Sequence, residues 1–138
     1  MRDREIYITE YDVKRLRELL QVVKESGYRG RDDLEKLEAE LNRGKLVPPR
    51  DVPADVITMN SKVCLIDLDT GEEMTCTLVF PDDADIDQNK ISVLAPIGTA
   101  MLGYSVGDTF EWQVPAGLTR FQVKEILYQP EASGDYHL

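Results

Sequence analysis

The spacing of apolar residues changes once along the chain and divides it into two segments. From Thr9 to Gly44, apolar residues recur every three or four positions, the period of a helix with one buried face. Two such stripes are present: Val13, Leu16, Leu20 and Val23, and then Leu34, Leu37 and Leu41. Thr9 can cap the first helix, and Asp32 or Asp33 the second. We predict a short antiparallel helical hairpin whose base packs on the rest of the protein.

Beyond a proline-containing linker at residues 47–50, apolar and polar residues alternate as in strands. We expect strands at 63–68, 74–80, 90–94, 109–114 and 119–127, with one short helix before the fourth. The first two strands flank Asp69–Gly71, which has the composition of a three-residue hairpin loop. The predicted fold class is α+β, with a helical hairpin at 1–47 and a sheet domain at 48–138.

The expected hairpin loop fixes which residues face each other across the first two strands. With a loop of Asp69 to Gly71, Cys64 and Cys76 become cross-strand neighbours, close enough to touch. A redox switch and a pair of reduced core thiols both fit that geometry. Because two cysteines in a chain of this size do not make a disulfide framework, we expect core thiols. A register shift of one residue would remove the contact.

Charge is divided unevenly between the two segments. Residues 1–47 hold 11 Lys/Arg and 11 Asp/Glu, whereas residues 48–138 hold 5 and 15, a net charge of −10. An acidic domain argues against direct nucleic-acid binding there. Its acidity either steers it toward a basic protein surface or only keeps the protein in solution. With neither a membrane-length apolar run nor a secretory leader in the sequence, we expect a cytoplasmic protein.

Three patterns suggest enzyme or metal chemistry, and none has the context it needs. Residues 103–107 match G-x-S-x-G, but here a helix precedes the serine and a strand follows it, the reverse of a nucleophile elbow. The aspartates at 83, 85 and 87 begin like a calcium loop that lacks its central glycine and final glutamate. The aromatic residues Tyr104, Phe110 and Trp112 fit a core better than a ligand pocket. We expect no catalytic residue, metal or cofactor.

The segment 91–114 carries the most specific pattern. A strand leads into Ala-Pro-Ile-Gly at 95–98, a helical turn ends at Gly103, and Val-Gly-Asp at 106–108 precedes another strand. This order resembles the C-terminal domain of the bacterial Gre transcript-cleavage factors. The runs at 58–61 and 128–138 are similar to those of the short-armed Gre relatives called regulators of nucleoside diphosphate kinase. The resemblance implies a bent antiparallel sheet domain like that of the immunophilin (FKBP) prolyl isomerases, after a coiled-coil hairpin.

The resemblance also implies a polymerase-binding surface. In Gre factors, the strand-to-helix corner around the proline contacts the rim of the RNA polymerase secondary channel, helped by an acidic residue two positions earlier. Here the corner consists of Leu94, Pro96, Ile97 and Gly98, with Leu94 at the acidic position. Either Leu94 makes an apolar contact in place of the ion pair, or it belongs to the core.

At the hairpin tip, the resemblance draws attention to Glu25, Asp32 and Asp33. Gre factors use an acidic pair at the tip of a long coiled coil to help hold a second Mg²⁺ during transcript hydrolysis. This hairpin is far shorter, and helix capping accounts for Asp32 and Asp33 without metal chemistry.

The resemblance therefore implies a monomeric, non-enzymatic regulator that binds RNA polymerase and competes with Gre factors without stimulating cleavage. The alternatives are a weak prolyl isomerase, a cleavage-stimulating factor, or a module that acts on nucleoside diphosphate kinase.

Overall fold

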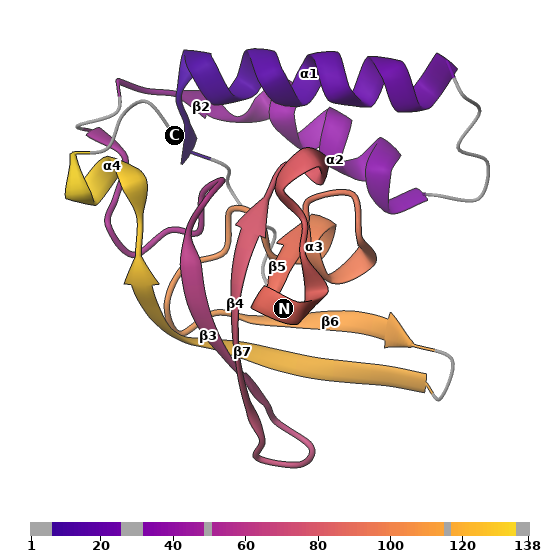
Figure 1. The fold of residues 1–138 in the computed structure, drawn as a ribbon, viewed down its shortest axis with the longest axis vertical. Coiled ribbons are helices and arrows are strands. Elements are labelled where there is room, and N and C mark those ends of the chain that lie inside the picture. Colours follow the sequence, from indigo (N-terminus) through magenta and orange to yellow (C-terminus); the bar gives the residue numbers. More distant parts are fainter. Residues whose placement is uncertain (1–6, 26–31, 49–50, 115–116, 135–138) are drawn as a thin grey trace.

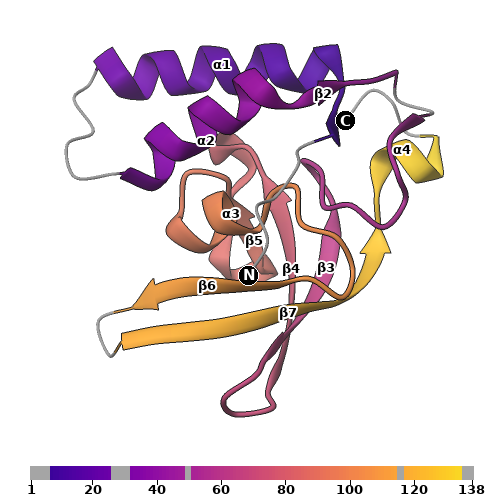
Figure 2. The ribbon, with the colours of Figure 1, turned by 180° about the vertical axis from the view of Figure 1, so that it is seen from behind.

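Two helices lie across one side of a twisted sheet, and a third, short helix lies between them and the sheet (Figures 1 and 2). The computed structural model describes residues 7–25, 32–48, 51–114 and 117–134. Helices α1 (Glu10–Glu25) and α2 (Asp32–Arg43) run antiparallel, as the two stripes predicted. Thr9 caps α1, because its hydroxyl accepts a hydrogen bond of 3.1 Å from the backbone N–H of Asp12. Among the described residues, no helix has the length and apolar character of a membrane span.

The sheet has five strands in the order β5-β4-β3-β7-β6, which confirms the α+β class. The strands are β3 (Lys62–Asp67), β4 (Glu73–Val79), β5 (Lys90–Ser92), β6 (Thr109–Val114) and β7 (Gly117–Tyr128). The expectation of a fully antiparallel sheet is wrong at one edge, where β5 pairs with β4 in parallel. Residues 80–89 cause this, because their two 3₁₀ turns, Pro81–Asp83 and Ile86–Gln88, carry the chain back before β5 begins.

Three smaller elements were not expected from the sequence. Strands β1 (Tyr7–Ile8) and β2 (Lys45–Leu46) form a parallel pair at the base of the hairpin. Helix α4 (Pro130–Ser133) follows β7, so the sheet domain has a second short helix in addition to α3 (Pro96–Met101). Elements of two or four residues leave little periodic signal in a sequence.

The loop between β3 and β4 is one residue longer than predicted, so the two cysteines do not face each other. Asp67 pairs with Glu72, and Cys64 faces Thr75 whereas Cys76 faces Val63. The carboxylate of Asp67 accepts hydrogen bonds from the backbone N–H groups of residues 69 and 70, at 2.8 and 3.2 Å, and so draws residue 68 into the loop. Successive residues of a strand point to opposite faces, so the thiols lie on different faces of the sheet.

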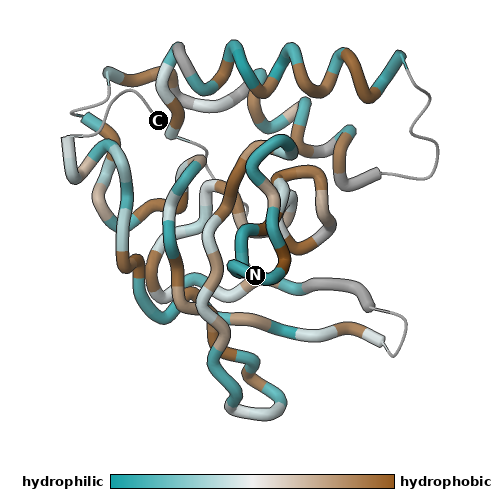
Figure 3. The backbone as a smooth tube through the Cα atoms, in the orientation of Figure 1, coloured by the Kyte–Doolittle hydropathy of each residue, from teal (hydrophilic) through white to brown (hydrophobic). Residues whose placement is uncertain are grey.

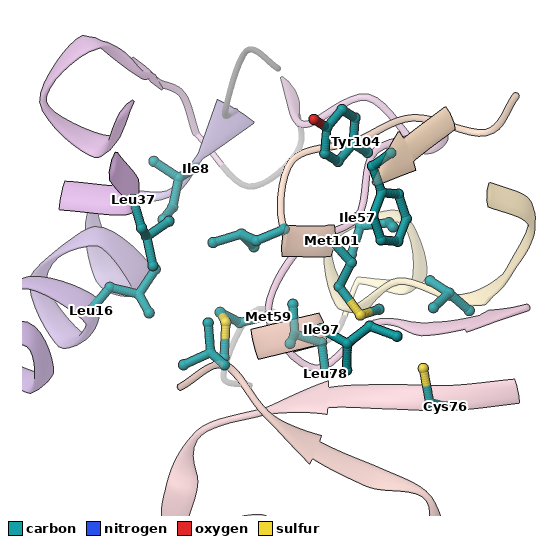
Figure 4. Close-up of a cluster of buried hydrophobic side chains, with 14 of the residues drawn as sticks. Ile8, Leu16, Leu37, Ile57, Met59, Cys76, Leu78, Ile97, Met101 and Tyr104 are labelled. Carbon is teal, nitrogen blue, oxygen red and sulfur yellow. The ribbon is translucent and has the colours of Figure 1, made fainter. Parts of the chain in front are cut away.

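The hairpin and the sheet domain share one hydrophobic core. Along both helices, apolar positions alternate with polar ones (Figure 3). Leu16 and Leu37 are fully buried, and they face Met59, Ile97 and their neighbours (Figure 4). Burial extends along α2 from Leu34 to Leu41, so more than the base of the hairpin is packed. Helices of 16 and 12 residues cannot bury their stripes in each other alone. The guanidinium of Arg15 adds a contact 3.8 Å above the Phe80 ring.

Residues near both ends of the chain and from the segment between β2 and β3 meet at the base of the hairpin, a cluster we call the joint (Asp12, Thr58, Ser61, Gln129 and Glu131). The Gln129 amide donates to the carbonyls of residues 53 and 56, at 2.8 and 2.6 Å, and so ties the segment before β3 to the end of β7. Thr58 and Ser61 share a hydrogen bond of 2.9 Å, and Thr58 also bonds Glu131.

Two carboxyl groups of the joint, Asp12 and Glu131, are buried, and each has an oxygen without a hydrogen-bond partner among the described residues. Burial is the main reason that the pKa of Asp12 rises to about 7; the charge of Glu131 adds to the rise and Arg15 opposes it. Burial also raises the pKa of Glu131, against the hydrogen bond from Thr58. Asp12 belongs to α1 and Glu131 to α4, so the pair spans the contact between hairpin and sheet domain.

Gly98 fixes how closely α3 approaches the sheet. A Cβ atom at this position would lie 2.2 Å from the backbone oxygen of Ser92 in β5 and 3.2 Å from the side chain of Leu78. Only a residue without a side chain allows this approach, and the close approach positions the corner between β5 and α3.

We predict that Gly98→Ala lowers the free energy of unfolding by about 1–3 kcal/mol, because the added methyl group must displace backbone. Urea denaturation measures the change. Ser133→Ala, an exposed change in α4, should stay within about 0.5 kcal/mol of the parent protein. An unchanged midpoint for Gly98→Ala would contradict the close packing of α3 on β5.

Asp12 should make folding stability fall as the pH rises. Between its usual pKa of 3.8 and its folded value of about 7, the folded state holds a proton that the unfolded state has lost. The contribution is fully present below that window and is lost above it. The stability that Asp12→Asn gains over the parent protein should therefore be larger at pH 8 than at pH 5, by roughly 2–3 kcal/mol, because pH 5 lies inside this window and only part of the contribution is lost there.

Thermal unfolding at the two pH values measures this difference. Glu10→Gln, which removes an exposed charge from the same helical turn, is the matched control and should show no such pH dependence. An equal effect of Asp12→Asn at both pH values would contradict a protonated Asp12 at the joint.

Candidate functional site

The corner between β5 and α3 is built mainly from backbone hydrogen bonds. The Ser92 hydroxyl accepts from the N–H of Leu94, and the Ser92 carbonyl accepts from the N–H of Ala95, both at 3.0 Å. Ala95 has extended backbone (φ −69°, ψ 144°), and Pro96 follows at the start of the helix, where its missing N–H costs nothing. From inside, the buried Thr99 hydroxyl donates to the carbonyl of Val93. Hydrogen bonds to Ser92 and from Thr99 therefore fix the turn.

The four residues predicted at this corner do not share one environment. Leu94 is half-buried and packs against the edge of the core. Ile97 and Gly98 are buried, so they support the corner from beneath. The side chain of Pro96 lies outside the described residues, although its backbone begins α3. Of the predicted residues, Leu94 is the one whose described side chain reaches the surface.

The predicted tip residues lie where α1 ends and α2 begins. Glu25 is the last residue of α1, is exposed, and accepts a hydrogen bond of 3.2 Å from the amide of Gln21 one turn earlier. Asp32 and Asp33 are the first two residues of α2, so they lie inside the helix and not at the capping position before it, and their side chains lie outside the described residues. Within the described part of the chain, no three acidic, histidine or cysteine side chains gather as a metal site.

The patterns set aside in the sequence have structural roles. The Asp85 carboxylate accepts from the N–H of Asp87 and so caps a 3₁₀ turn. Burial raises the pKa of Cys76 to about 11, and burial followed by hydrogen bonding to Glu73 raises that of Cys64. Both thiols therefore stay protonated near neutral pH, where a nucleophile would need to be a thiolate.

Two of the aromatic residues considered for a pocket belong to the core. Tyr104 and Phe110 are buried and stack with ring centroids 5.3 Å apart, and Phe121 lies 6.0 Å beyond Phe110. The side chain of Trp112 lies outside the described residues.

Sequence reasoning missed the joint. The runs at 58–61 and 128–138 contributed only to a resemblance, and the structure brings Thr58 of the first run against Glu131 of the second. Asp12 looked like an ordinary acidic residue in a first helical turn. A signal was available, because two runs that belong together in a family are candidates for contact in space.

Comparison with known proteins agrees with this architecture. Residues 4–47 match the family described as "Rnk N-terminus", and residues 52–128 match "Transcription elongation factor, GreA/GreB, C-term". The chain is 41% identical over 134 residues to the "Regulator of nucleoside diphosphate kinase" of Escherichia coli K12, with 96% of each chain covered. It is 36% identical over 95 residues to GreA of Syntrophotalea carbinolica, covering 69% of this chain and 60% of that protein.

A solved structure supports the same assignment. The "Prokaryotic transcription elongation factor GreA/GreB" of Nitrosomonas europaea aligns with a TM-score of 0.76 and 42% identity, covering 90% of this chain and all of that one. The names of these relatives describe regulators and elongation factors. The chain therefore belongs to the family of regulators of nucleoside diphosphate kinase, whose C-terminal domain is shared with the GreA/GreB transcription elongation factors.

Proposed function

We propose that this protein is a non-enzymatic, monomeric regulator that binds RNA polymerase at the rim of its secondary channel and competes there with Gre factors. The sheet domain, residues 48–138, supplies the contact through the corner around Leu94 and Pro96, with Ile97 and Gly98 beneath it. We further propose that this domain has the bent immunophilin-like (FKBP-like) form and that residues 1–47 form a short coiled coil. The place of action is the cytoplasm, where the polymerase works.

One observation carries the proposal: the hairpin packs along its length on the sheet domain, within the same core. With 16 residues at about 1.5 Å each, α1 is only about 24 Å long. An arm held in this way has little free length with which to reach an active site deep in a channel. A protein that docks but does not reach inward would block the channel to longer relatives without stimulating cleavage.

The surface of the sheet domain supports a protein partner at the corner. Residues 48–138 carry a net charge of −10, which favours encounter with a basic rim and disfavours nucleic acid. The corner is also pre-organised, because the backbone of Leu94 and Ala95 is fixed by Ser92. Binding to it therefore costs little ordering entropy.

The name of the Escherichia coli relative favours a second candidate, direct regulation of nucleoside diphosphate kinase. Binding to purified kinase and to purified polymerase, measured side by side, separates the two functions. The enzyme alternatives, prolyl isomerisation and stimulated cleavage, are separated by a peptide isomerase assay and by a cleavage assay on stalled complexes.

The docking proposal predicts that the protein displaces a fluorescent Gre factor from core RNA polymerase. Leu94→Arg should weaken this displacement by roughly tenfold or more, because it puts a cation where the proposal needs an apolar contact with a basic surface. Leu118→Arg is the matched control, because Leu118 is exposed on β7 and should tolerate the change. Fluorescence anisotropy at moderate salt measures the competition. Equal competition by both variants would contradict docking at the corner.

The proposal also predicts that the tip carboxylates do no metal chemistry. The double variant Asp32→Asn/Asp33→Asn should compete with Gre factors as well as the parent protein, and neither protein should raise the cleavage rate of stalled transcripts. A transcript-cleavage assay with Mg²⁺, with a Gre factor as the positive control, gives both readings. Cleavage stimulated by the parent protein and lost in the double variant would overturn this part of the proposal.

A further inference from the structure

Four side chains form a row across the face of the sheet opposite the core. The strand register aligns Tyr128 of β7 with Lys62 of β3, Lys62 with Thr77 of β4, and Thr77 with Lys90 of β5. Residues directly paired across strands point to the same face. Two lysines therefore flank a threonine hydroxyl over three adjacent strands, with a tyrosine beside them.

This row lines a hollow of about 350 Å³, the size of a small-ligand site. Val79 lies two residues beyond Thr77 on the same strand, is buried, and gives the hollow an apolar floor. Asn60 and Asp83 complete the lining. The hollow thus combines a few polar groups with apolar surface.

The two lysines differ from the other cations of the sheet domain. Among residues 51–114 and 117–134, Arg120 pairs with Asp69 at 3.8 Å and Lys124 pairs with Glu73 at 2.6 Å. Lys62 and Lys90 make no ion pair with any described residue, although the domain carries far more acidic than basic groups. The two unpaired ammonium groups of this described region therefore line the same hollow.

We propose that this hollow binds the phosphate group of a small phosphorylated molecule. Lys62 and Lys90 approach the phosphate from its two sides, and the Thr77 hydroxyl donates a hydrogen bond from between them. The Tyr128 ring offers a face to the organic part of the ligand. The four residues of the row are distinct from the corner residues 94–98, so phosphate binding can be tested apart from polymerase docking.

The surroundings favour a small ligand over a nucleic acid. The loop between β4 and β5 carries Asp82, Asp83, Asp85 and Asp87, and Asp83 reaches the hollow. A single phosphate group would meet only the near end of this acidic loop, whereas an extended phosphate backbone would also run past its other carboxylates and be repelled.

The test uses inorganic pyrophosphate as the probe, titrated into the ¹⁵N-labelled full chain and followed by amide chemical shifts. Saturable shifts centred on residues 62, 77, 90 and 128 are expected. Lys62→Met/Lys90→Met should weaken binding by roughly tenfold or more, because it removes both charges but keeps the length of the side chains. Lys124→Met, which breaks an ion pair on the same sheet, is the matched control and should bind like the parent protein.

Two outcomes would overturn the proposal. The first is the absence of saturable shifts at these four positions, or shifts that persist unchanged in the double variant whose spectrum shows it to be folded. The second is tighter binding by a single-stranded oligonucleotide than by pyrophosphate at the same residues, which would make the site a nucleic-acid surface.

Discussion

Burial of the helical stripes against the sheet domain is the interaction on which the rest of this structure depends. Leu16, Leu37 and Leu65 are all fully buried in one continuous core, so neither part hides its apolar surface without the other. The two helices are too short to be stable as an isolated hairpin, and packing supplies what their length cannot. The same packing limits what the hairpin can do, because a helix pair held on the domain is not a free arm.

Two local features, the joint and the corner, fit within that packing. At the joint, Gln129 ties the segment before β3 to the end of the sheet, while the carboxyl groups of Asp12 and Glu131 are buried at the hairpin contact. At the corner, Gly98 lets α3 sit against β5 and leaves Leu94 at the surface. The joint and the corner differ in their energetic cost. The joint buries ionisable groups away from water, whereas the polar backbone groups of the corner form hydrogen bonds within the corner itself. Family membership and this division of roles together support a docking regulator with a short, restrained hairpin.

Much of the fold could be predicted from local pattern. The period of the leucines specified both helices, the Thr9 hydroxyl caps the first of them, and alternation located the strands to within a few residues. The facing of the cysteines was missed because the side chain of Asp67 binds two backbone N–H groups and lengthens the loop, a choice that composition does not reveal. Parallel pairing of β5 depends on the path of a loop, and part of the rise in the pKa of Asp12 comes from the charge of Glu131, near the other end of the chain. The corner could be located only through family resemblance.

The central claim is that the hairpin and the sheet domain fold as one unit, and amide hydrogen exchange under native conditions tests it most directly. If they share a core, the amides around Leu16 and Leu20 in α1 exchange only through global unfolding, with the same free energy as those around Leu65 and Val123 in the sheet. Exchange of the α1 amides at a much lower free energy, while the sheet stays protected, would contradict the claim. The hairpin would then be a separately opening arm with greater reach.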